Sequence, residues 1–180
     1  NNSVSFNGAT DKSEYYVSFS QISDDGMVPT DADSYDKYTF SARGSHKVKA
    51  LTFSSSLNYS YQKNKFATTG QGLTMLNSLY QTPRDVSIIS LQDQNDIFNS
   101  PGYFYTPYGV MNPYYILENY LNEYDAERFY GKFQVDYDFL KYFKFTYRMG
   151  LDTTTGQSNR GEPNLYALFY EGTPNGEGMG

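Results

Sequence analysis

LTFSSSLNYSY, residues Leu51 to Tyr61, alternates apolar or aromatic residues with small polar ones, and only Ser55 interrupts the row. A period of two is the side-chain period of a β-strand, because successive residues of a strand point to opposite faces. The stretch therefore predicts a strand with one apolar face and one polar face. Its apolar row consists of Leu51, Phe53, Leu57, Tyr59 and Tyr61.

Five further segments alternate in the same way and are also predicted to be strands. They are Val4–Thr10, Glu14–Ile22, Asp36–Ser45, Glu127–Tyr137 and Phe143–Leu151. Short turns join the first strand to the second, the third to the fourth and the fifth to the sixth. The pattern thus predicts about six strands in three hairpins. The residues after Asp152 are rich in Gly, Asn and Thr and are predicted to form a loop.

Residues 62–125 show no strand pattern and are predicted to form one long connection. Short helices are predicted at Leu73–Tyr80 and at Tyr114–Leu121, the second after Asn112-Pro113. A connection of this length is uncommon in a compact domain and is usually functional. The alternation resumes cleanly after it, which favours a functional loop.

The composition excludes several classes of protein. The chain has 180 residues, no Trp, 20 Tyr and 13 Phe, so its apolar surface is mostly aromatic rather than branched aliphatic. A net charge of −6 argues against nucleic acid as a partner. Without Cys, the chain has neither a disulfide framework nor a thiolate metal site.

The connections alternate between short turns and long loops, which is a feature of transmembrane β-barrels. Predicted strands of about nine to eleven residues are long enough to cross a bilayer when tilted. We therefore expect an all-β fold: an antiparallel transmembrane β-barrel segment with long extracellular loops that carry short helices. Outer-membrane lipid would cover the apolar row, and the charged residues of the other row would face the lumen. These are Arg43, Lys132, Asp136, Lys144 and Arg148.

The same alternation also fits a soluble antiparallel β protein with one wet face. On that interpretation the chain is a secreted β-sheet module that binds carbohydrate through surface aromatic residues. The scarcity of branched aliphatic residues and the uneven connection lengths favour the barrel.

Several motifs resemble, in order and spacing, the barrel of SusC/RagA-type TonB-dependent outer-membrane transporters of Bacteroidetes. The first is VSFNGATDKSEYYVSFSQISDDGMV at 4–28, followed by YDKYTFSARGSHKVKALTFSSSLNYSY at 35–61. Thr82-Pro83-Arg84-Asp85-Val86 is similar to the "TPRD" segment of the family, and Asn112-Pro113-Tyr114 resembles its "NPY" turn. Arg128-Phe129-Tyr130-Gly131 and Leu151-Asp152 fit the hairpin that follows.

The resemblance implies a location in the cell outer membrane and TonB-dependent import of glycans or peptides. It also implies a SusD-like surface lipoprotein as a lid over the extracellular side. Family members carry an N-terminal plug inside the barrel. Because the plug, the TonB box and most strands are absent, residues 1–180 are expected to be a fragment of such a barrel, with 62–125 as a long extracellular loop. TonB would act through the absent N-terminal part.

An aromatic cluster in the long connection is the best candidate for substrate recognition. Tyr combines a flat face with a hydroxyl, which suits a sugar or a peptide in a wet cavity. The alternative is that these rings pack the loop or contact the lid protein. The candidate substrate-binding residues are Tyr103, Tyr105, Tyr108 and Tyr114.

No constellation of residues indicates an enzyme, a metal site or a cofactor. His46 is the single histidine and shows no partner in the sequence, so a solvated turn residue is favoured over a general base. An acidic group could supply oxygen ligands for Ca²⁺ but lacks the spacing of a known calcium loop, which favours a solvated loop. It comprises Asp24, Asp25, Asp31, Asp33 and Asp36.

Overall fold

The structure is a computed structural model that describes residues 1–101, 104, 110–139 and 142–164. Six strands are present: β1 (Asn2–Ala9), β2 (Ser13–Asp24), β3 (Ser34–Val48), β4 (Leu51–Lys65), β5 (Leu121–Phe139) and β6 (Phe143–Gly161). The helices are α1 (Met75–Gln81) and α2 (Pro113–Asn119), with 3₁₀ turns η1 (Ile89–Gln92) and η2 (Ile97–Asn99). All six predicted strands and both predicted helices are confirmed.

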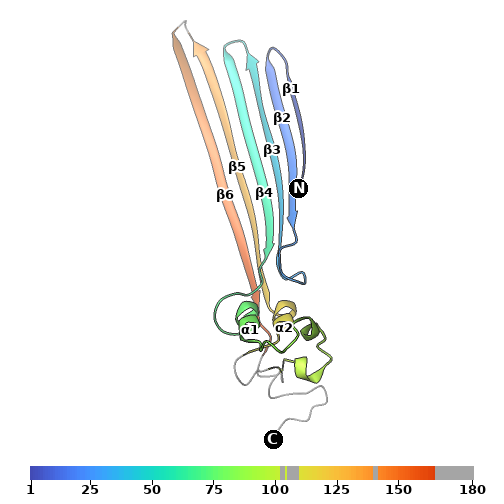
Figure 1. The fold of residues 1–180 in the computed structure, drawn as a ribbon. Coiled ribbons are helices and arrows are strands. Elements are labelled where there is room, and N and C mark those ends of the chain that lie inside the picture. The colour runs from blue at the N-terminus through green and yellow to red at the C-terminus, as the bar shows by residue number, and fades with distance from the viewer. Residues whose placement is uncertain (102–103, 105–109, 140–141, 165–180) are drawn as a thin grey trace. The chain divides into compact units, whose positions relative to one another are not determined.

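The strands form a single antiparallel sheet in which they follow one another in chain order, as Figure 1 shows. In the described residues the sheet is open, with β1 and β6 as its edges. Val4 pairs with Phe19 across β1 and β2, and Val17 pairs with Ala42 across β2 and β3. The fold is therefore all-β around three hairpins, as the alternation predicted.

Five strands, β2 to β6, contain their predicted ranges and extend beyond them, and the prediction of a loop after Asp152 is wrong. β6 continues to Gly161, β5 begins at Leu121 rather than Glu127, and β4 continues to Lys65. The extensions of β4 and β6 are polar on both faces, so they lack the alternation that marks a half-buried strand, and the N-terminal extension of β5 places Leu121, Tyr124 and Ala126 without a period of two. The strand conformation is kept by backbone pairing instead: the Phe66 amide donates to the Asn122 carbonyl at 2.9 Å, where β4 and β5 end and begin.

The turn between β3 and β4 is shorter than predicted. A turn was expected from His46 to Ala50, but β3 runs through His46 to Val48. Only Lys49 and Ala50 remain between the strands, and Lys49 has a φ of 56°. A positive φ in a two-residue turn matches the twist of a hairpin, which lets the ladder extend to its end.

The chain divides into two compact units. The sheet unit comprises Asn1–Gly26, Ser34–Asn64 and Tyr124–Ser158. The loop unit comprises Met27–Asp33, Lys65–Glu123 and the residues from Asn159. Both α-helices belong to the loop unit, so the described part of the sheet unit consists of strands and their turns.

The loop unit has an apolar core of its own, made of two clusters. One contains Met75, Met111, Ile116 and Leu117, and the other contains Leu91, Phe104, Val110 and Tyr114. Among the described residues, the fully buried apolar side chains of Leu91, Met111 and Ile116 all lie in these clusters. The long connection is therefore a folded unit rather than an extended loop.

Asn112 fixes this unit at the start of α2. Its side chain is fully buried and donates through Nδ2 to the carbonyls of Leu91 and Asn99, each at 2.8 Å. Its Oδ1 accepts the amide of Tyr114 at 2.9 Å, and Pro113 occupies the first turn. Asn before Pro is a strong helix start signal, because the Asn side chain caps an amide and Pro lacks one.

Candidate functional site

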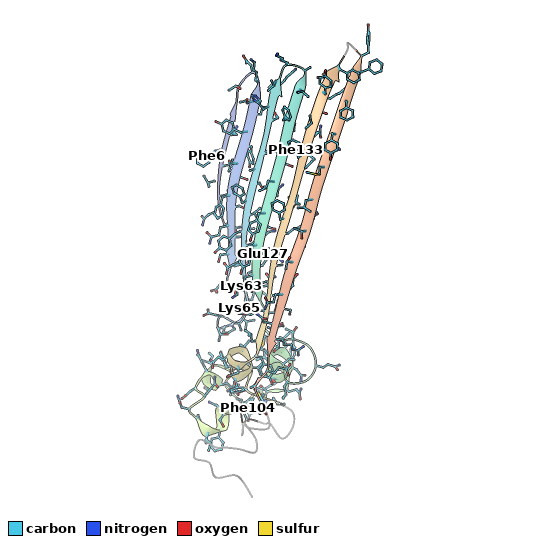
Figure 2. The ribbon with its side chains drawn as sticks, turned by 180° about the vertical axis from the view of Figure 1, so that it is seen from behind. Phe6, Lys63, Lys65, Phe104, Glu127 and Phe133 are labelled. Atoms are coloured by element: carbon cyan, nitrogen blue, oxygen red, sulfur yellow. The ribbon has the colours of Figure 1, made fainter. Side chains whose placement is uncertain are left out.

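One face of the sheet carries large apolar side chains, and all of them except Phe129 and Val135 are exposed. We call this set the apolar face. Phe6 is 66% exposed and Leu151 is 61% exposed, and Figure 2 shows Phe6 and Phe133 on β1 and β5. The apolar face comprises Val4, Phe6, Tyr15, Val17, Phe19, Tyr38, Phe40, Phe53, Leu57, Tyr59, Phe129, Phe133, Val135, Tyr137, Phe139, Phe143, Phe145, Tyr147, Met149 and Leu151.

Ring contacts show that neighbouring strands present these residues on the same side. Phe19 and Tyr38 stack across β2 and β3, with their centroids 6.4 Å apart. Phe139 stacks on Phe143 across β5 and β6 at 5.7 Å. The Asp138 amide donates to the Ala50 carbonyl, so Asp138 pairs with Ala50 in the antiparallel ladder of β4 and β5. In this register the odd-numbered residues of β4 and the odd-numbered residues of β5 lie on the same face of the sheet.

The height of the apolar face fits a bilayer. On β5 it runs from Phe129 to Phe139, which spans about 34 Å along a strand at about 3.4 Å per residue. With the tilt of about 45° that barrel strands adopt, this becomes roughly 24 Å, close to the apolar band of membrane barrels. On β4 the row ends in Tyr59 and Tyr61 and then turns to Lys63 and Lys65. Aromatic and then basic residues are typical of a membrane boundary.

A polar network occupies the opposite face at the hairpin of β5 and β6. Thr146 donates to Oδ1 of Asp136 at 2.6 Å, and Gln134 donates to its Oδ2 at 2.8 Å. Arg148 donates through Nε to Oε1 of Gln134 at 3.0 Å, and Lys144 Nζ lies 3.8 Å from Asp136 Oδ1. Asp136 is only 7% exposed, so these partners stabilise a charge that is largely withdrawn from water.

Two further cross-strand contacts lie on the same polar face. Arg128 binds Asp152 with two hydrogen bonds, from Nε at 3.1 Å and from Nη2 at 2.7 Å. The Arg43 guanidinium lies over the Tyr16 ring, 4.4 Å from its centroid. Arg128 and Asp152 are exposed, and such a surface ion pair contributes little stability on its own. These contacts place the charged residues on the face of the sheet opposite the apolar face, as the alternation predicted.

Among the described residues, no helix has the length and apolar character needed to span a membrane.

The loop unit contains two neighbouring cavities. The larger, of about 870 Å³, lies among Met27, Val28, Phe66, Leu73 and Leu76, with polar groups at its wall. The smaller, of about 460 Å³, includes Asp31 and Glu118. Both sizes lie within the usual range for small-molecule sites. Lys65, Tyr120 and Asn122 line both cavities, so the two are adjacent.

Asp33 shapes the wall of the larger cavity. Its Oδ2 accepts the Met27 amide at 2.9 Å, and its Oδ1 accepts the Val28 amide at 3.2 Å. The carboxylate thus closes the connection between β2 and β3 into a turn. At the start of this connection, Oδ1 of Asp24 accepts the Gly26 amide at 3.1 Å and forms a second local turn. Within the described ranges, no group of three or more acidic or histidine side chains is placed to hold a metal ion.

His46 has a partner that the sequence did not indicate. Its Nδ1 lies 2.6 Å from Oγ of Ser13, and the two residues are directly paired across β2 and β3. Both side chains are in the exposed part of the hairpin end. The contact joins the first residue of β2 to the end of β3.

Three of the four candidate substrate-binding tyrosines, Tyr103, Tyr105 and Tyr108, lie outside the described residues. Tyr114 is described, and it is 9% exposed in the cluster with Leu91 and Val110. Its ring packs the loop unit, as the alternative interpretation of the cluster states. A role in substrate contact for these four residues stays a prediction.

Burial affects two tyrosines near the cavities. It raises the pKa of the Tyr115 hydroxyl above its ordinary value of 10.0. It also raises the pKa of Tyr120, with a smaller contribution from the negative charge of Glu162. Both phenols are therefore neutral hydrogen-bond donors across the physiological range.

We expect the loop unit to lose stability as the pH rises above 10, the ordinary tyrosine value. Raised pKa values mean that the folded state holds these protons more tightly than the unfolded state. The two protonated tyrosines contribute fully to the stability of the folded state at pH values below the pKa of the unfolded chain. This contribution is lost as the pH rises through the higher pKa of the folded chain. Amide hydrogen exchange in α2 measures the effect, after correction for intrinsic exchange. The Tyr120→Phe variant should lose part of this pH dependence, and an unchanged profile would contradict the assignment.

The sequence did not reveal the cavity residues Lys65, Thr68 and Tyr120. The cavities are formed by the segments 27–33, 65–76, 117–123 and 160–162, which are far apart along the chain.

Comparison with known proteins gave no match, either to a protein-family model or to a curated protein.

Proposed function

We propose that this chain forms part of the wall of an outer-membrane β-barrel importer of the SusC/RagA type. In this proposal the barrel takes up glycans or peptides with energy supplied through TonB, and a SusD-like surface lipoprotein covers its outer side. The loop unit lies on the extracellular side of the membrane.

The observation that carries the proposal is the exposed apolar face, which extends over all six strands. A soluble protein rarely leaves so large a continuous apolar surface exposed to water. Lipid would cover it, and the polar face would then line a water-filled interior. The sequence motifs that resemble the family, among them Asn112-Pro113-Tyr114 and Thr82-Pro83-Arg84-Asp85-Val86, favour the same proposal.

Site-directed nitroxide labels test the membrane part of the proposal, and the absence of Cys from this sequence simplifies their placement. The variants are Phe133→Cys on the apolar face and Lys132→Cys, its neighbour on the opposite face, each in the full-length chain in native membranes. The label at 133 should collide mainly with oxygen, which concentrates in lipid. The label at 132 should collide mainly with a water-soluble nickel complex. Equal exposure of both labels to the nickel complex would instead identify a soluble β-sheet module.

Copurification tests the importer part. The full-length chain extracted in mild detergent should retain a surface lipoprotein. A membrane-embedded chain that purifies alone would contradict the lid partnership while leaving the barrel intact.

A further inference from the structure

Two basic residues lie directly opposite each other on the polar face of the β5–β6 hairpin. Arg128 binds Asp152 across these strands, which fixes their register. Counting forward from Arg128 and back from Asp152 by the same number of residues places Lys132 opposite Arg148. A second cross-strand ion pair, nearer the turn, has the same register.

A third basic residue lies in the same row on β3. In the register of β4 and β5, Ser56 lies opposite Lys132. Only two residues join β3 to β4, and counting back from this turn places Arg43 opposite Ser56. Figure 1 shows β3 to β6 side by side. With strands about 4.8 Å apart, the backbone positions of Arg43 and Arg148 are about 14 Å apart. We call Arg43, Lys132 and Arg148 the basic row.

The side chains of the basic row form no ion pair with a carboxylate among the described residues. Arg43 lies over the ring of Tyr16, 4.4 Å from its centroid, and Nε of Arg148 donates to the neutral Oε1 of Gln134 at 3.0 Å. Both guanidinium groups are thus held in place by uncharged partners. The carboxylate of Asp136 on the same hairpin is occupied by three side chains outside the basic row.

Lys132 and Arg148 are neighbours of like charge, and both are exposed. Like charges directly opposite each other destabilise a sheet, because their Cβ atoms are only about 5 Å apart. A group with two negative charges would neutralise both residues, whereas a carboxylate would neutralise only one. A phosphate monoester carries about 1.5–2 negative charges at pH 7 and has three acceptor oxygens. The pair therefore fits a phosphate group better than a carboxylate.

A cavity of about 500 Å³ lies at the Arg43 end of the basic row. Its lining includes the side chains of Asn7, Tyr16 and Ser54, and Glu14 is its carboxylate. The volume is enough for a small solute. Amide, hydroxyl and carboxylate groups bind hydroxyl groups of a ligand, so the cavity suits a hydroxylated molecule. The cavity and the basic row both belong to the sheet unit.

We infer that the polar face of the sheet binds small hydroxylated phosphate esters, such as sugar phosphates, at the basic row. Lys132 and Arg148 hold the phosphate group between them, and Arg43 binds oxygen atoms at the other end of the ligand. The inference goes beyond the proposed import function and does not depend on what covers the apolar face, because the basic row lies on the opposite face.

Isothermal titration calorimetry of the full-length chain in detergent and phosphate-free buffer tests the inference. The probes are glucose 6-phosphate, glucuronate and glucose, which share a sugar ring and differ in charge. Glucose 6-phosphate should bind about tenfold more tightly than glucuronate, because its second negative charge gains a further charge-assisted hydrogen bond. Glucose should bind more weakly than either.

Lys132→Gln separates binding from folding. It should weaken the binding of glucose 6-phosphate about tenfold. The ligand-free variant should be as stable as the unaltered chain or more stable, since one of two neighbouring like charges is removed. Thermal unfolding without ligand measures this. Lys37→Gln, on β3 outside the basic row, is the matched control and should leave binding unchanged.

Three outcomes would overturn the inference: equal binding of the phosphate ester and glucuronate, no binding of glucose 6-phosphate, or equal losses in Lys132→Gln and Lys37→Gln. The last would show that only the overall charge of the chain matters. If binding fails while the nitroxide label at 133 reports lipid, the barrel proposal stands and only the phosphate site has failed. If that label reports water while Lys132→Gln weakens binding as expected, the phosphate site stands and the barrel proposal has failed.

Discussion

Replacing Phe133 with lysine is expected to lower the stability of the membrane-inserted barrel by about 2–4 kcal/mol, the depth-dependent cost of a basic side chain at the middle of the bilayer. Phe133 lies near the centre of the apolar row of β5, which runs from Phe129 to Phe139. A lysine there would leave its ammonium group in hydrocarbon or distort the lipid around it. The fraction of folded, membrane-inserted chain should fall, and equilibrium unfolding in lipid vesicles measures the change.

Ser5→Lys is the matched control on the opposite face of the sheet. Ser5 is exposed and pairs with Ser18, so lysine meets only small polar neighbours. We expect a change of about 0.5 kcal/mol or less, as for surface substitutions generally. Equal effects at Phe133 and Ser5 would show that lipid does not cover the apolar face.

The Asn112→Ala variant is expected to destabilise the loop unit by about 3–5 kcal/mol, the sum expected when several buried polar groups lose their partners. The Leu91 and Asn99 carbonyls would each lose a donor, and the Tyr114 amide would lose its acceptor. The start of α2 would also lose its cap. Amide hydrogen exchange of α2 in the full-length chain measures the free energy of local opening.

Asn119→Ala provides the control at the other end of the same helix. Asn119 is exposed, and its Nδ2 donates to the Tyr115 carbonyl at 2.9 Å. Water can replace that bond, so the expected change is about 0.5 kcal/mol or less. If Asn112→Ala leaves the exchange of α2 as slow as the control does, the loop unit is held by its apolar clusters alone.

Sequence alternation was sufficient to locate all six strands and to separate their faces. It failed where a strand is polar on both sides. Residues 152–161 carry no apolar row, yet they continue β6, because the backbone of β5 offers partners along its whole length. Pairing between distant segments leaves no local pattern in such a stretch.

The sequence also marked both short helices, the second through the start signal Asn112-Pro113. It could not show that the long connection builds a core of its own. The clusters around Ile116 and Leu91 join residues many positions apart, and their members follow no single period. Tyr114 illustrates the difficulty: an exposed ring for substrate and a buried ring for packing look the same in sequence.

By itself, the sequence determined the all-β class, the three hairpins and the two faces of the sheet, because a period of two is a local property of the strand. Only the tertiary structure decided where the strands end, how Asn112 holds the loop unit together, and that Lys65, Thr68 and Tyr120 line the larger cavity of the loop unit. These features depend on contacts between segments far apart in the chain, and no local pattern records such contacts.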